Sequence, residues 1–197
     1  MSPGDRRLPY GFKADCDRLA VQLRVELGLA PTDPLDPFAL AAHLEIPIRA
    51  LSSMGADPEA CGYFLGEGGG EFSAVTLVVA RRRRVIYNDG HNPERQRSDI
   101  MHELAHALLQ HMGTPPLTSD GMRNWNSPIE HEAAELAGHL LVPDDAAIRC
   151  ALKAKPVAEC ARRYGVSVEL MTWRVRTSGG SSIVARSRRS DPRSPNL

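Results

Sequence analysis

The sequence predicts an α+β fold, in which a small, mostly antiparallel sheet packs against helices. Three observations indicate this class. Apolar residues recur at helical spacing near the N-terminus, short β-like runs follow between residues 46 and 87, and helical spacing returns in the second half. The chain has 197 residues without an internal repeat, which suits one domain.

The first half begins with a predicted helix over Phe12–Leu29, because apolar residues recur every three or four positions and Gly28 stands where a helix ends. The proline-rich stretch 31–37 predicts a connector. A short helix over 38–44 follows, with Asp36 as its N-cap. The predicted strands are 46–51, 61–65, 75–80 and 84–87, and the glycine-rich segment 66–70 predicts a hairpin-like loop between two of them.

The second half predicts a helix from about residue 90 through His111, a loop over 113–128 and a helix from about Pro128 to Leu141. Two or three shorter helices fit 144–176. We expect residues 1–11 to be a flexible N-terminus and 12–176 to be the domain, with 145–176 as its C-terminal helical subdomain. The segment 177–197 is rich in Ser, Gly, Arg and Pro and predicts a disordered tail.

Composition limits the classes of function. The 24 basic residues equal the 24 acidic ones, so bulk charge gives no reason to expect binding to nucleic acid or a membrane surface. No apolar stretch approaches the roughly 20 residues of a membrane span, and residues 1–11 show no secretory signal. The four cysteines lie far apart, and we expect reduced thiols in a cytoplasmic protein.

One motif carries chemistry: an H-E-x-x-H sequence, His102-Glu103-Leu104-Ala105-His106, within a helical pattern. Positions i and i+4 lie on one face of a helix, so both imidazoles can reach one Zn²⁺. Glu103 points about 100° away from His102. It is placed to act as the general base that takes a proton from water at the metal.

The alternative is a pair of structural histidines on a surface helix. Against it, an apolar stripe lies well away from the three polar residues, so the helix would bury its back and present them to a cleft. This stripe consists of Ile100, Met101, Leu104, Leu108 and Leu109. The metal site is therefore the preferred interpretation.

A catalytic zinc needs a third protein ligand and one open position. The next predicted helix offers Glu130, Glu132 and Glu135. On a helical wheel, Glu130 falls within about 50° of the centre of the apolar face, where a carboxylate needs a compensating cation. We therefore expect Glu130 to be the third ligand, with Glu132 in reserve and Glu135 solvated.

These two helices resemble the ImmA/IrrE family of zinc-dependent endopeptidases. The matching residues are Arg95-Gln-Arg97-Ser-Asp-Ile-Met-His102-Glu-Leu-Ala-His106, then Glu130-x-Glu-Ala133 and Leu140-Leu-Val-Pro143. The resemblance covers about residues 12–176. It implies a compact zincin-like (gluzincin-like) domain that binds Zn²⁺ through His102, His106 and Glu130, with Glu103 as base.

The resemblance also implies a bacterial, phage or mobile-element regulator that cleaves a helix-turn-helix transcriptional repressor. The chain departs from the family pattern at Ala134, where Asn or Asp is usual, and at Leu136, where Phe is usual. A polar group at the first position would orient a ligand imidazole. Asp99 is a candidate substitute for it.

Other features have weaker claims to function. The run Arg81–Arg84 predicts a solvated hairpin turn, and the arginines of the tail predict a solubilising segment; contact of either with nucleic acid is the less favoured interpretation. Residues 161–173 have a helix-turn-helix look, although a packing role is favoured. Candidates for stabilising an oxyanion are Tyr87, His91, His111, His131 and His139.

The main hypothesis is thus a zinc endopeptidase whose substrate pairs with an exposed strand edge, such as Arg84–Tyr87. A second hypothesis is a non-proteolytic regulator that binds and sequesters a transcription factor. The intact Glu103 argues against it, because a structural zinc site needs no base. A direct DNA-binding regulator is a third and weaker hypothesis.

Overall fold

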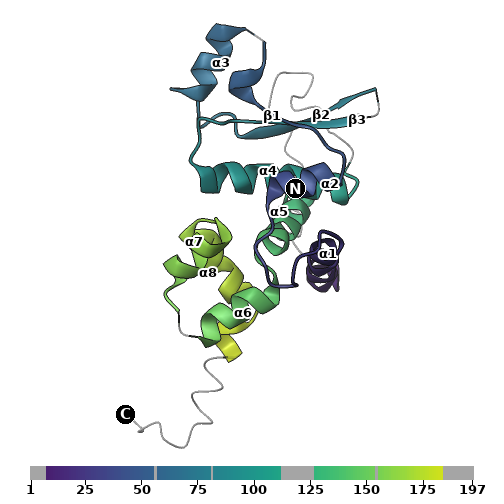
Figure 1. The fold of residues 1–197 in the computed structure, drawn as a ribbon, viewed down its shortest axis with the longest axis vertical. Coiled ribbons are helices and arrows are strands. Elements are labelled where there is room, and N and C mark those ends of the chain that lie inside the picture. Colours follow the sequence, from purple (N-terminus) through teal and green to yellow (C-terminus); the bar gives the residue numbers. More distant parts are fainter. Residues whose placement is uncertain (1–7, 56, 81, 112–126, 154, 184–197) are drawn as a thin grey trace, which may run out of the picture.

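The computed structural model describes residues 8–55, 57–80, 82–111, 127–153 and 155–183 (Figure 1). Of the sequence predictions, Arg81, most of the loop 113–128, the tail arginines and the first seven residues lie outside these ranges. The elements are α1 (Phe12–Glu26), α2 (Pro37–His43), β1 (Ile48–Ala50), η1 (Leu51–Ser53), α3 (Pro58–Leu65), β2 (Ala74–Val79), β3 (Arg82–Tyr87), α4 (Pro93–Leu108), α5 (Ser127–Leu141), α6 (Asp144–Leu152), α7 (Val157–Tyr164) and α8 (Val168–Thr177).

The sheet has the strand order β1-β3-β2. β2 and β3 pair antiparallel from Ala74↔Tyr87 to Val79↔Arg82, while the shorter β1 pairs with β3 in parallel. The prediction of an α+β fold with a small, mostly antiparallel sheet is therefore confirmed. Because β3 is the central strand, paired on both sides, the prediction that Arg84–Tyr87 offers an open edge is wrong.

Helix α4 lies between the sheet and α5, and α1 packs on α5 as well (Figure 1). The buried side chains Ile100, Met101 and Leu104 of α4 meet Leu136 and Leu140 of α5 in one continuous core. Burial of these large aliphatic groups stabilises the layer by roughly 1.5–3 kcal/mol each. The two helices that carry the predicted site residues are therefore held against each other by the core.

Helices α6, α7 and α8 form the lower part of Figure 1, with α8 packed against α5, α6 and α7. Gly165 takes the left-handed conformation (φ 60°) that ends α7. A disulfide joins Cys150 of α6 to Cys160 of α7, so the prediction of four reduced thiols is wrong. The Cα atoms of the two cysteines lie 6.4 Å apart.

Three further local predictions differ from the structure. Residues 61–65, predicted as a strand, belong to α3, so the segment 66–70 follows a helix and does not connect two strands. The side chain of Asp57 caps α3 by accepting the backbone N–H of Glu59. Of the predicted hairpin turn at Arg81–Arg84, residues 82–84 belong to β3.

The ends of the domain bear on two other expectations. Beyond α8, residues 180–183 form a helical turn, and the rest of the predicted tail, 184–197, lies outside the described ranges. Among the helices that the structure describes, none combines the length and the apolar character that crossing a membrane requires.

Candidate metal centre

The local sequence builds α4 and directs its polar face. Asn92 caps the helix by accepting the backbone N–H of Arg95 at 2.8 Å, and Pro93 occupies the first helical position. Ile100, Met101, Leu104 and Ala105 are buried. His102, Glu103 and His106 lie between them on the half-buried side of the helix, so both histidines face the same side one turn apart.

The structure brings the nitrogens of two histidines and one carboxylate oxygen to a single point. His102 Nε2 lies 3.0 Å from Glu130 Oε2, and His106 Nε2 lies 3.1 Å from His102 Nε2. The distance from His106 Nε2 to Glu130 Oε2 is 3.5 Å. Atoms this close need a shared hydrogen or a cation between them, because all three can otherwise only accept.

The donor set and its spacing fit zinc. Ligand atoms at 2.0–2.1 Å from a tetrahedral Zn²⁺ lie about 3.3–3.4 Å apart. The three separations in this structure, 3.0, 3.1 and 3.5 Å, bracket that value. Hydrogen bonds from His102 and His106 hold the pKa of the Glu130 carboxyl well below its usual range, so this oxygen stays anionic and able to bind a metal.

Glu103 is fixed by a contact that crosses from the helix to the sheet. Thr76 of β2 donates its hydroxyl hydrogen to Glu103 Oε2 at 2.5 Å. This holds the carboxylate on the side of α4 that faces the strand. Sequence reasoning did not find Thr76, because the contact joins residues 27 positions apart and depends on how β2 packs on α4.

Comparison with known protein families fits this geometry. Residues 65–176 match the family model Peptidase_M78, described as the IrrE N-terminal-like domain. The match covers more than half of the chain. The chain belongs to this family. The comparison with curated proteins found no match.

Membership of this IrrE-like peptidase family confirms the resemblance to ImmA/IrrE proteins. The family is of the zinc metallopeptidase type. The matched range contains both α4 and α5, and therefore all four residues that the sequence singles out for metal binding and catalysis. It leaves out α1, although α1 packs on α5.

The other two glutamates of α5 lie in different surroundings from Glu130. Glu132 Oε2 accepts a hydrogen bond from His111 Nε2 at 3.2 Å. His111 in turn contacts His106, so Glu132 is connected to the three converging atoms only through His111. Glu135 is buried, with 2% of its side chain exposed, so the prediction that it is solvated is wrong. Lys13 of α1 and Arg174 of α8 pack around it and supply the positive charge that its burial requires.

The structure separates the five candidates for oxyanion stabilisation. His131 is exposed and His139 is buried beside Glu135 and Asp144. His91 bonds to Asp99 and to the carbonyl of Gly69, and Tyr87 packs edge-on against Phe38. His111 alone among the five contacts a proposed ligand, His106, and does so at Nδ1, on the far side of the ring from the converging atoms.

Asp99, the candidate substitute for the polar group that Ala134 lacks, bonds to His91 Nδ1 at 3.2 Å and pairs with Arg95. Among the described residues it makes no hydrogen bond to His102 or His106. Burial raises the pKa of its carboxyl. Asp99 therefore does not orient a ligand imidazole.

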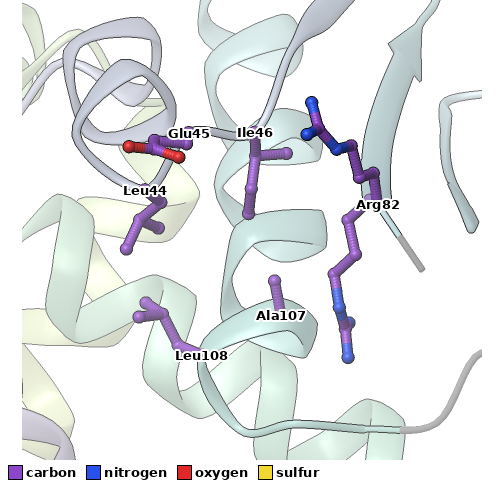
Figure 2. A pocket seen from close by; sticks show the side chains of 7 residues that line it. Leu44, Glu45, Ile46, Arg82, Ala107 and Leu108 are labelled. Atoms are coloured by element: carbon purple, nitrogen blue, oxygen red, sulfur yellow. The ribbon is translucent and has the colours of Figure 1, made fainter. Parts of the chain in front are cut away.

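A cavity of about 450 Å³ borders the C-terminal end of α4. Figure 2 shows its apolar side chains, among them Ile46 and Leu108, with Glu45 and Arg82 as charged groups. His102, His106 and Glu130 are absent from its lining. The cavity is thus separate from the cluster of ligand atoms.

Proposed function

We propose that the chain is a zinc-dependent endopeptidase in which His102, His106 and Glu130 hold the metal and Glu103 is the general base. The observation that carries the proposal is the convergence of two imidazole nitrogens and one carboxylate oxygen within 3.5 Å of one another, beside a glutamate. Three protein ligands leave the fourth position open, which distinguishes a catalytic zinc site from a structural one.

Each residue then has one task. Zinc, when bound, acts as a Lewis acid and lowers the pKa of water at the site from 15.7 to about 7. Glu103 takes the proton of the attacking water and delivers it to the leaving amine. Thr76 holds Glu103 through its hydroxyl, so that the carboxylate meets the water in one orientation.

We propose that the substrate binds as an extended segment along β2. β2 pairs with β3 on one side, and no other described strand pairs with it. Its end is unusually apolar for an edge strand, since Leu77, Val78 and Val79 are 40–54% exposed. Thr76, which holds the general base, lies on the same strand, so a peptide added to this edge would pass beside Glu103.

The proposed physiological substrate is a helix-turn-helix transcriptional repressor, as the resemblance to the ImmA/IrrE family implies. An extended, locally unfolded linker of such a repressor has the conformation that an edge strand can bind. We propose that the chain acts on this protein and makes no direct contact with DNA, because its charges balance at 24 basic against 24 acidic residues.

The test uses purified chain, zinc and a helix-turn-helix repressor as the candidate substrate, together with a quenched-fluorescent peptide library. Glu103→Gln keeps the shape of the side chain and removes the base. We expect it to retain zinc and to lose at least about 100-fold in cleavage rate, the lower end of what a general base contributes. Full cleavage by this variant would refute the mechanism. Binding of the repressor by a zinc-loaded wild type that cleaves no peptide would favour sequestration.

A further inference from the structure

A chain of three side chains runs away from the metal centre. His106 Nδ1 lies 3.0 Å from His111 Nδ1, and His111 Nε2 lies 3.2 Å from Glu132 Oε2. His111 is largely buried, with 11% of its side chain exposed, and its ring meets that of His106 at 66°. The contact therefore joins the side of His106 that faces away from Glu130 to a second carboxylate of α5.

The backbone at the end of α4 brings His111 into this position. Gln110 adopts a left-handed conformation (φ 56°), which a residue other than glycine seldom takes. The N–H of His111 then bonds to the carbonyl of His106, and the N–H of Gln110 to that of Ala107, which is the Schellman pattern of a helix end. This turn folds residue 111 back over residue 106.

A separate contact fixes the same turn from the sheet. Arg83 of β3 donates from Nη2 to the backbone carbonyl of His111 at 3.1 Å. His111 is thus held at its backbone by Arg83, at its ring by Glu132 and through its amide by α4. A residue fixed from three elements has few rotamers to lose, so it can hold its neighbour at little cost in entropy.

Metal binding at His106 would determine which nitrogen carries the hydrogen in each ring of this hydrogen-bond chain. A nitrogen that binds zinc carries no hydrogen, so His106 would bind through Nε2 and keep its hydrogen at Nδ1. That N–H then donates to His111 Nδ1, which must be bare, and His111 donates from Nε2 to Glu132. Each of the three groups finds a partner of the right kind, with no donor facing a donor.

We propose that His111 and Glu132 are positioning residues for the ligand His106: they fix its tautomer and ring orientation through an unbroken hydrogen-bond chain. The proposal rests on the zinc site proposed above. Hydrogen-bond partners of this kind raise the basicity of a ligand imidazole and pre-orient it, and their loss costs 10–100-fold in metal affinity. The exposed His131, next to Glu132 on α5, is the matched control.

The experiment measures the dissociation constant for Zn²⁺ by competition with a chromophoric chelator. His111→Leu fills the site without a polar atom, whereas His111→Asn places an acceptor near the position of Nδ1. We expect affinity to fall 10–100-fold in His111→Leu and to stay within about threefold of wild type in His111→Asn. His131→Leu should match wild type. Thermal melting of the metal-free proteins shows that each variant folds.

Equal affinities for wild type, His111→Leu and His111→Asn would overturn the positioning role while leaving the zinc site intact. A loss of equal size in His111→Leu and His111→Asn would also overturn it, since the effect would then be one of packing. Failure of the wild type to bind zinc would overturn the site itself. As a second measurement, Glu132→Ala should weaken zinc binding, and Glu132→Gln, whose amide oxygen still accepts from His111, should weaken it less.

Discussion

The buried guanidinium of Arg174 is the group whose removal should destabilise the domain most clearly. Its side chain is fully buried; Nη2 lies 2.6 Å from Asp144, Nη1 lies 3.9 Å from Glu135, and Nε donates to the carbonyl of Val142 at 2.9 Å. Arg174→Met keeps much of the volume and removes the charge. Asp144 then loses its arginine, and the buried Glu135 keeps only the more exposed Lys13 as a counter-charge. Breaking a buried ion pair in this way costs about 3–5 kcal/mol.

In a chain of this size, one kcal/mol shifts the melting temperature by about 2–4 °C, so Arg174→Met should melt roughly 6–20 °C lower. Urea unfolding followed by circular dichroism gives the free energy directly. The control is Arg176→Met on the exposed side of α8, which should change stability by less than about 0.5 kcal/mol. Equal losses in the two variants would show that the buried position of Arg174 carries no special stability.

A double-mutant cycle separates the charge from the packing. Adding Glu135→Gln to Arg174→Met removes the buried carboxylate that has lost one of its two counter-charges, so the double variant should recover part of the lost stability. The remaining loss reports the hydrogen bond to Val142 and the pairing with Asp144. A double variant less stable than the sum of the two single losses would place the cost elsewhere.

Three further predictions follow from single contacts. Thr76→Val removes the hydroxyl that holds Glu103 and should lower kcat about tenfold in a peptide-cleavage assay, with zinc content unchanged. Gly138→Ala would push a methyl group into the ring of Trp173. The overpacking costs about 1–3 kcal/mol and should outweigh the roughly 1 kcal/mol gain in helix propensity, so urea unfolding should show a lower free energy of unfolding. Burial lowers the pKa of His139, so the unfolded chain takes up this proton more readily, and the free energy of unfolding in EDTA should fall as pH drops below about 6.5.

Each of the three has a matched control. Thr76→Ser retains the hydroxyl and should retain the rate; equal loss in both variants would point to packing. Gly62→Ala lies in α3 with open space around the new methyl group and should stabilise the protein by up to about 1 kcal/mol. His139→Gln should flatten the pH dependence, and an unchanged profile would assign it to other groups.

The charges around His139 set the sign of that prediction. Burial is the largest cause of its lowered pKa, and Arg174 is the second. Asp144 and Glu135 act in the opposite direction, and Asp17 of α1 also faces this cluster. The neutral ring therefore contributes stability above pH 6.5, and this contribution is lost as pH falls through the folded pKa.

The sequence is sufficient to predict α4, α5 and the meeting of His102, His106 and Glu130, because these depend on helical periodicity and on spacing within one motif. Glu130 is nevertheless half-buried beside α4 and does not point into the apolar core. The helical wheel therefore selects the residue that lies beside His102, although the burial that it predicts for Glu130 is wrong. A wheel describes one helix. It misplaced Glu135 because the charges that compensate it come from α1 and α8.

Contacts between elements that lie far apart in the sequence could not be predicted from local sequence patterns. Thr76 reaches Glu103 only after β2 packs on α4, and His111 reaches His106 only because Gln110 takes a left-handed turn. The short apolar run at 61–65 fits a strand or a helix equally well; Asp57 and Pro58, a cap and a first-position proline, were the signal for a helix.

If the zinc site is as we propose, His102, His106 and Glu130 together hold one zinc ion. Metal analysis after dialysis against a weak chelator measures this zinc content, and the comparison of Glu130→Ala with Glu132→Ala separates a ligand from a residue that only positions one. We expect one zinc per chain in wild type and Glu103→Gln, almost none in His106→Ala or Glu130→Ala, and measurable zinc in Glu132→Ala. Full zinc in Glu130→Ala together with none in Glu132→Ala would exclude Glu130 and make Glu132 the third ligand.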